Sequence, residues 1–150
     1  MRGNQIFSAN DGIFLADYGP EPFAANLRRA TLQNDAFRTA LWTGNHLQLT
    51  LMRIEAGGEI GLESHPELDQ FLWIERGRGL VKMGARKDHF SYQRPVSAGW
   101  CILIPAGTWH NLINTGCGPI HLYSLYAPPQ HPRGTVQKTP AEAAAGETAE

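Results

Sequence analysis

Residues 57–77 read GGEIGLESHPELDQFLWIERG, and this stretch decides how the rest of the chain is interpreted. Glu63 and His65 stand two residues apart at the end of an extended segment, so both side chains leave the same face of a strand. Pro66 cannot continue a ladder of strand hydrogen bonds, and the residues after it turn the chain. Gln70 opens the next apolar run and can return beside the first pair. The stretch therefore predicts a strand, a turn and a second strand, with three candidate ligands on one face.

Outward from this stretch, residues 46–127 consist of short apolar runs separated by glycine and proline, which is typical of an all-β sandwich or barrel. Several runs are apolar on both faces, so we expect a second sheet or another subunit to cover their outer side. The sequence predicts strands at Leu47–Ile54, Gln70–Glu75, Gly79–Met83, Trp100–Ile104, His110–Asn114 and His121–Tyr126.

The ends of the chain differ from this central region. Residues 1–45 are predicted to form an N-terminal arm with a short helix in PFAANLRRATLQN, residues 22–34. Residues 46–132 form the predicted barrel. Residues 133–150 lack large apolar side chains after Val136 and are predicted to be a flexible C-terminal tail. No internal repeat is apparent, which favours a single barrel.

Composition excludes several classes of protein. The 150 residues are 42% hydrophobic with a net charge of −1, which suits one globular domain with its own core. Basic residues are scattered, so we expect no nucleic-acid partner. We also expect no membrane partner and a cytoplasmic location, because no apolar run approaches the length of a bilayer span or a signal sequence.

A second cluster occupies residues 99–114, GWCILIPAGTWHNLIN, in which a buried strand ends at Pro105 and His110 begins the next strand. Together the two clusters resemble the paired motifs of the cupin superfamily, G-x5-H-x-H-x3/4-E-x6-G and G-x5-P-x-G-x2-H-x3-N. Every spacing is kept, and the second motif matches at every position. In the first motif, Glu63 replaces a histidine and Gln70 replaces a glutamate. The longer segment 20–139 resembles small bacterial cupins labelled mannose-6-phosphate isomerase-like.

The resemblance implies a single antiparallel jelly-roll β-barrel with one divalent metal ion inside it, either Zn, Mn, Fe or Ni. It also implies that Glu63, His65, Gln70 and His110 are the metal ligands. The two replacements leave the ligand charge unchanged at one carboxylate. Two histidines, one glutamate and one glutamine also make up the ligand set of mannose-6-phosphate isomerases, in a different order along the chain.

Three functions are compatible with this reading. The first is a metal-dependent isomerase or epimerase of a small sugar or sugar phosphate. The second is an Fe(II)-dependent dioxygenase on the same ligand set. If Gln70 does not bind the ion, Glu63, His65 and His110 form the two-histidine, one-carboxylate face of non-haem iron oxygenases. The third is a binding module that holds a metal or sugar without turnover. We expect a homodimer, because the strand that Gln70 opens is also apolar on its outer face.

Other polar residues are weaker candidates. His131 is the further histidine that we expect nearest the barrel mouth, because the chain around it could fold back over the barrel. The basic residues Arg38, Arg53, Arg78 and Lys82 could hold a phosphate or carboxylate, but scattered surface charge is the commoner explanation and is the interpretation preferred.

Overall fold

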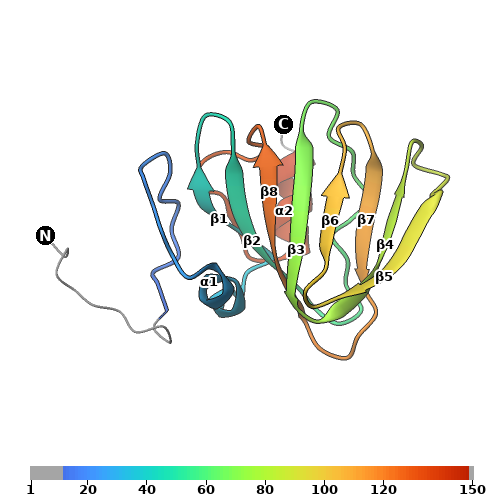
Figure 1. Cartoon of the computed structure of the whole chain (residues 1–150), viewed down its shortest axis with the longest axis horizontal. Helices are drawn as coiled ribbons and strands as arrows, with labels where there is room; N and C mark the ends of the chain where they lie inside the picture. Colours follow the sequence, from blue (N-terminus) through green and yellow to red (C-terminus); the bar gives the residue numbers. More distant parts are fainter. Residues whose placement is uncertain (1–11, 149–150) are drawn as a thin grey trace, which may run out of the picture.

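The computed structural model describes residues 12–148, which form two facing antiparallel sheets and two short helices (Figure 1). In chain order the elements are α1 (Leu27–Gln33), β1 (Arg38–Thr43), β2 (Gln48–Ile54), β3 (Asp69–Arg76), β4 (Arg78–Gly84), β5 (Tyr92–Ser97), β6 (Cys101–Ile104), β7 (Trp109–Asn114), β8 (Ile120–Ala127), β9 (Val136–Gln137) and α2 (Pro140–Thr148).

The strand order is β6-β3-β8-β2-β1-β9 in the larger sheet and β5-β4-β7 in the smaller one. Every paired neighbour is antiparallel. Residues 59–63 continue the smaller sheet, because Glu59 and Glu63 form isolated bridges to Ile113 and His110 on β7. The predicted all-β jelly-roll barrel is confirmed.

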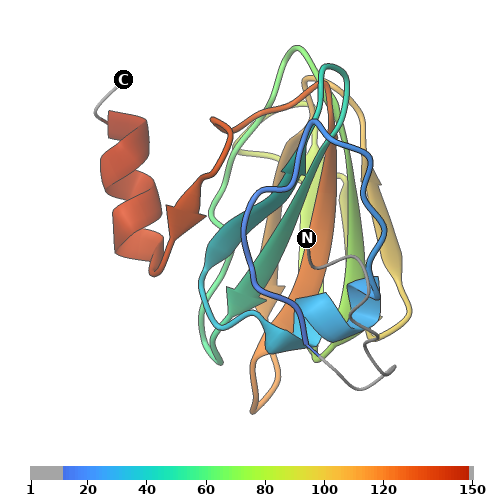
Figure 2. The same cartoon turned by 90° about the vertical axis from the view of Figure 1, so that its left-hand side faces the viewer.

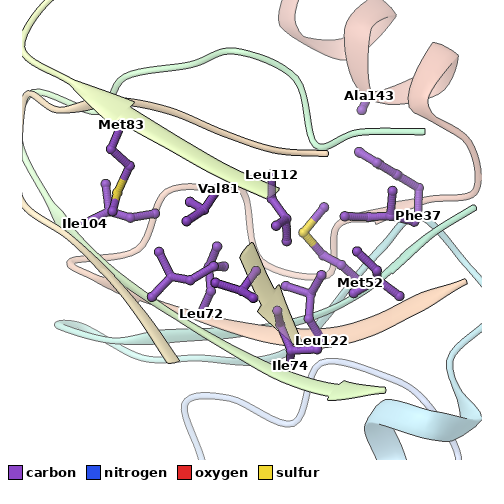
Figure 3. Packing of buried hydrophobic residues seen from close by; sticks show 14 residues of the cluster. Phe37, Met52, Leu72, Ile74, Val81, Met83, Ile104, Leu112, Leu122 and Ala143 are labelled. Atoms are coloured by element: carbon purple, nitrogen blue, oxygen red, sulfur yellow. The ribbon is translucent and has the colours of Figure 1, made fainter. Parts of the chain in front are cut away.

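The apolar core lies between the two sheets (Figure 3). Along β3 the burial alternates, so that Leu72 and Ile74 face the core while Phe71 and Trp73 face outward and are half-buried. This alternation with a period of two is what a half-covered strand requires. The core cluster contains Met52, Leu72, Ile74, Val81, Leu112, Ile120, Leu122 and their buried neighbours.

The N-terminal arm covers part of the outer face of the larger sheet. Tyr18, Phe23 and Leu27 pack with Leu41 and Leu51 in a second apolar cluster. The covering layer expected from the two-sided apolar strands is therefore supplied, in part, by the arm of the same chain. The arm is fixed further by Asp17, which accepts hydrogen bonds from the Thr43 hydroxyl and the Gly134 amide.

The predicted arm differs from the structure in two details. Helix α1 begins at Leu27, five residues after Pro22, because the Asn26 side chain accepts a hydrogen bond from the Arg29 amide and caps the helix there. Strand β1 lies within the range predicted as arm and pairs with β2 as an integral strand of the sheet.

Residues 133–148, expected to belong to a flexible tail, contain β9 and α2. β9 pairs with β1, and α2 stands on one side of the barrel (Figure 2). Alanine favours helix formation, and Ala143 of α2 is buried in the central core cluster with Phe37. Neither helix within residues 12–148 combines the length and apolar character needed to span a membrane.

Candidate metal centre

The interior of the barrel is apolar at one level and polar at another. Cross-strand pairing aligns Gln48, Tyr126 and Gln70 in one row across β2, β8 and β3, and all three side chains are buried. The next inward-facing row contains Thr50 and Ser124, both fully buried. Side chains in a cross-strand row lie on the same face of a sheet. These polar rows therefore form one wall of an interior site.

The opposite wall is formed where the two sequence motifs pair. The Glu63 amide donates to the His110 carbonyl at 3.1 Å, and the His110 amide donates to the Glu63 carbonyl at 2.9 Å. Two residues that exchange both hydrogen bonds stand directly opposite each other, so their side chains project to the same side. The Gly107 amide also donates to the His65 carbonyl at 2.9 Å, which links the motifs a second time.

Gly107 adopts the left-handed conformation, with φ at 82°. Only glycine populates this region without a steric penalty, so the PAG turn depends on it. Asp69 supports the same turn, because its carboxylate accepts a hydrogen bond from the Ala106 amide at 2.9 Å. Asp69 thus shapes the loop that precedes His110.

Three of the four predicted ligands converge. One ligand atom from each of Glu63, His65 and His110 lies within 4.8 Å of the others. Glu63 Oε1 is 3.3 Å from His65 Nε2 and 3.5 Å from His110 Nε2. The two imidazole rings are 5.5 Å apart between centroids. This separation of nitrogen and oxygen donors around one point is compatible with a bound divalent ion.

The fourth predicted ligand, Gln70, lies on the polar wall beside Tyr126, whose ring is 6.0 Å from that of His65. Its Nε2 donates to Ser124 Oγ at 2.9 Å, which fixes the amide and leaves Oε1 free. Gln70 Oε1 is buried and has no hydrogen-bond partner.

The two histidine nitrogens that face Glu63 are buried and, like Gln70 Oε1, form no hydrogen bond. These atoms are His65 Nε2 and His110 Nε2. Leaving a buried polar atom unpaired costs about 1–3 kcal/mol. His110 Nδ1 lies 3.0 Å from the Thr108 carbonyl, an arrangement that puts the ring proton on Nδ1 and the lone pair on Nε2. The unpaired donors fit a metal ion, which would accept a lone pair from each.

The electrostatics of Glu63 favour its ionised form. Burial works to raise the pKa of this carboxyl group, but the adjacent imidazoles of His110 and His65 outweigh burial and hold the pKa below its usual range. Glu63 is therefore a carboxylate at neutral pH and can neutralise one charge of a cation.

A cavity of about 570 Å³ opens onto Glu63 and His65. Its other polar lining includes Arg38, Glu59 and Gln130, and Ala143 of α2 lines it from the side. A cavity of about 610 Å³ lies elsewhere, between β4, β5 and β6, and is lined largely by apolar side chains, none of which is a candidate ligand. The first cavity is thus the approach to the candidate metal centre.

His131 folds back over the barrel, as anticipated from its surroundings. Its backbone amide donates to Gln48 Oε1 at 2.9 Å, and its ring packs edge-on against Tyr126 at 5.2 Å. Burial, followed by the nearby Arg38 charge, lowers the pKa of His131 to about 3. The imidazole is therefore neutral at physiological pH.

The sequence interpretation missed Tyr126 and Ser124, although both fall on the inward face of a predicted strand. It named Arg38 among residues that could hold an anion but preferred a surface position for it. The structure corrects that position: only 2% of Arg38 is exposed. In contrast, Arg78 is exposed, and Arg53 pairs with Glu55 at 2.7 Å at the surface.

Comparison with known proteins gives consistent similarities. A family model described as a cupin domain matches residues 50–126. The uncharacterized protein YrkC of Bacillus subtilis is 61% identical over 148 residues, which is 97% of this chain and 80% of that protein. The uncharacterized protein L612 of Acanthamoeba polyphaga mimivirus is 37% identical over 115 residues, covering 76% of this chain and 70% of that protein.

The crystal structure of BH2720 from Bacillus halodurans superposes with a TM-score of 0.86 at 60% identity, covering 87% of this chain and 98% of that chain. The names of these proteins give no substrate, so the chemistry has to be argued from the site itself.

Proposed function

Because the chain belongs to the cupin family and gathers two imidazoles and a carboxylate in its barrel, we propose that it is a metal-dependent enzyme acting on a small polar oxygenated substrate. More narrowly, we propose a sugar or sugar-phosphate isomerase or epimerase, in keeping with the resemblance to mannose-6-phosphate isomerase-like cupins.

The observation that carries this proposal is the set of unpaired buried atoms. His65 Nε2, His110 Nε2 and Gln70 Oε1 are removed from water and form no hydrogen bond, and the two imidazole nitrogens face the Glu63 carboxylate at 3.3 and 3.5 Å. A bound Zn, Mn, Fe or Ni ion would be held by these atoms and Glu63, and would supply a Lewis acid that stabilises negative charge on substrate oxygens. With one carboxylate among four ligands, the site would retain a net positive charge.

Isomerisation also requires a group that accepts a proton. We propose His131 for this role because of its position: its ring packs against Tyr126, which in turn packs against His65. Its imidazole is neutral at physiological pH and has a lone pair for the proton, and its lowered pKa of about 3 makes it a weak base. General bases contribute about 10²- to 10⁴-fold to a rate, and a base with a pKa well below the operating pH is expected at the lower end of this range. Gln48 holds the His131 backbone through hydrogen bonds in both directions and so positions the ring.

The test is exchange of a substrate C–H proton with solvent. We would incubate metal-loaded protein with a panel of aldoses, ketoses and their phosphates in D2O and follow deuterium incorporation at C2 by NMR. The proposal predicts exchange that His65→Ala abolishes and His131→Asn slows by about 100-fold. His46→Asn, which alters an exposed histidine, is the matched control. Stoichiometric metal without exchange of any sugar would reject an isomerase and favour a binding module.

A dioxygenase is the second candidate, and one observation favours it. Glu63, His65 and His110 form by themselves a set of two histidines and one carboxylate, which is the ligand arrangement of non-haem iron oxygenases. Oxygen consumption by Fe(II)-loaded protein, with no deuterium exchange under anaerobic conditions, would favour this candidate over the isomerase.

A further inference from the structure

Arg38 is a buried cation without a counter-ion. It lies on β1 opposite Met52, a core residue, and only 2% of its surface is exposed. Its Nη1 donates to the neutral amide oxygen of Gln137 at 2.5 Å, while its Nε is buried without a partner. Among the residues that the structure describes, no carboxylate forms an ion pair with it.

This arrangement is costly unless something else pairs with the charge. A buried ionised group pays a large desolvation penalty, which is normally offset by an opposite charge. The Phe37 ring, 5.2 Å from the guanidinium carbon, offers only a cation–π contact. The structure therefore keeps a positive charge and a free N–H donor in an interior position that nothing in the described chain neutralises.

Arg38 also faces the candidate metal centre. It lines the same cavity as Glu63 and His65. The cavity contains a second carboxylate, Glu59, which is exposed and makes no ion pair with Arg38. A molecule in this cavity would therefore meet the metal ligands and the guanidinium together.

We propose that Arg38 binds a carboxylate of the substrate, so that the enzyme acts on a sugar acid whose anionic end contacts Arg38 while its hydroxyl or carbonyl oxygens face the metal ligands. This inference rests on the proposed function and narrows its substrate class. An arginine edge with Nε free can donate to both oxygens of a carboxylate. One guanidinium neutralises the single charge of a carboxylate more completely than the double charge of a phosphate.

A simpler role for Arg38 is to fasten β9, since its bond to Gln137 joins β1 to the C-terminal segment. The two roles differ in what Gln137→Ala should do. If Arg38 only fastens β9, Gln137→Ala and Arg38→Gln break the same contact and have the same effect. If Arg38 binds a carboxylate, only Arg38→Gln weakens anion binding.

The experiment uses three ligands that share one sugar ring and differ at C6: glucose, glucuronate and glucose 6-phosphate. Their affinities for the full-length, Mn-loaded protein are measured by calorimetry, with metal content determined in parallel. The variants are Arg38→Gln, the charge-retaining Arg38→Lys, Gln137→Ala, and Arg53→Gln as a surface control with the same charge change. Thermal melting checks that each variant is folded.

We expect wild type to prefer glucuronate to glucose by about tenfold or more, as a charge-assisted hydrogen bond allows. Arg38→Gln should erase this preference and leave glucose affinity unchanged, with an intermediate value for Arg38→Lys. Gln137→Ala and Arg53→Gln should keep the preference. If Arg38→Gln does not fold, Arg38→Lys against Arg53→Gln gives the same comparison.

The proposal is overturned if wild type does not prefer glucuronate, if it prefers glucose 6-phosphate, or if Gln137→Ala loses the preference as fully as Arg38→Gln. The metal content, measured in parallel, distinguishes failure of the Arg38 proposal from failure of the proposed metal-dependent function. An Arg38-dependent preference in protein that binds no metal would retain the anion site and reject the metal-dependent enzyme.

Discussion

At the scale of single residues, the candidate ligands are oriented by one distant neighbour and one local neighbour. Gln70 is fixed by Ser124, 54 positions later, and His110 by the carbonyl of Thr108, two positions earlier. Spacing within the two motifs predicted which residues converge, because two residues apart on a strand share a face. It could not predict the hydrogen bond that leaves Gln70 Oε1 free, since that bond depends on the pairing of β3 with β8. The bond that leaves His110 Nε2 free is local, but it depends on the turn that Gly107 and Asp69 shape before His110.

The Ser124→Ala substitution tests this orientation. Without its acceptor, the Gln70 amide can rotate, and we expect metal affinity to fall by about 10- to 100-fold, as is usual when a partner of a ligand is lost. Competition with a chelator measures the affinity. Ser97→Ala, on the exposed edge strand β5, is the control. Unchanged affinity in Ser124→Ala would show that Gln70 Oε1 does not ligate the ion.

Asp17 should make stability depend on acidic pH. Burial works to raise its pKa, but hydrogen bonds from Thr43 and from the Gly134 and Gly19 amides outweigh burial and lower the pKa from its ordinary value of 3.8. A carboxyl group whose pKa is lower in the folded state than in the unfolded state stabilises the fold at pH values above its unfolded-state pKa. This stability is lost as the pH falls through the folded-state pKa.

We therefore expect Asp17→Asn to be less stable than wild type at neutral pH. Below pH 3.8, the ordinary pKa of the carboxyl group, the variant should lose less stability on further acidification than wild type does. Urea unfolding across this range measures the difference. Asp88→Asn, at an exposed surface pair, is the matched control. Parallel stability curves for wild type and Asp17→Asn would contradict the assignment.

At the scale of elements, strands with an apolar run were predictable, including the edge strand β6, and the polar, exposed strand β5 was not. β3, β4, β7 and β8 follow their predicted ranges within about two residues, because each buries one face or both. β5 was missed because it is exposed at all positions but Val96 and contains Pro95, which an edge strand tolerates. The helix α2 was missed because one buried alanine gives it almost no apolar face.

That single alanine gives the test of α2. Ala143→Glu would bury a charge against the core, so we expect the free energy of unfolding to fall by about 1–3 kcal/mol and the helix to detach. Hydrogen exchange should accelerate in residues 140–148 and stay slow in β2 and β8. Ala141→Glu, at an exposed position of the same helix, should have neither effect. Equal exchange in both variants would contradict the packing of α2 through Ala143.

At the scale of the whole molecule, the larger sheet has one face toward the barrel interior, with polar rows at one level and apolar rows at another. Its outer face is apolar, and the arm covers only part of it. The two-sided apolar strands predicted that something must cover the outside, and the sequence separately predicted an N-terminal arm that packs on the barrel. Only the structure shows that this arm supplies part of the covering layer. Arg38 illustrates the limit of sequence reasoning. An isolated arginine carries no period or spacing, so its burial at the cavity that Glu63 also lines follows only from the folded arrangement of β1.

The part of the outer face of the larger sheet that the arm leaves uncovered is where we expect the predicted homodimer to form. Leu125, Phe71 and Leu103 form a row across β8, β3 and β6, and Leu103 is 65% exposed. We propose that a second copy packs against this row. Light scattering should give the mass of two chains for wild type and of one chain for Leu103→Glu, while Leu47→Glu, at an exposed position in the β1–β2 turn, stays dimeric. A monomeric wild type would reject the proposal.

The central claim is that the two sequence motifs build one metal site, and metal content tests it most directly. Wild type, saturated with Zn, Mn, Fe or Ni and then desalted, should hold about one ion per chain for at least one of these metals. The double variant His65→Ala/His110→Ala, folded by circular dichroism, should hold none. The same ion retained stoichiometrically by the double variant, or no ion retained by wild type, would contradict the account.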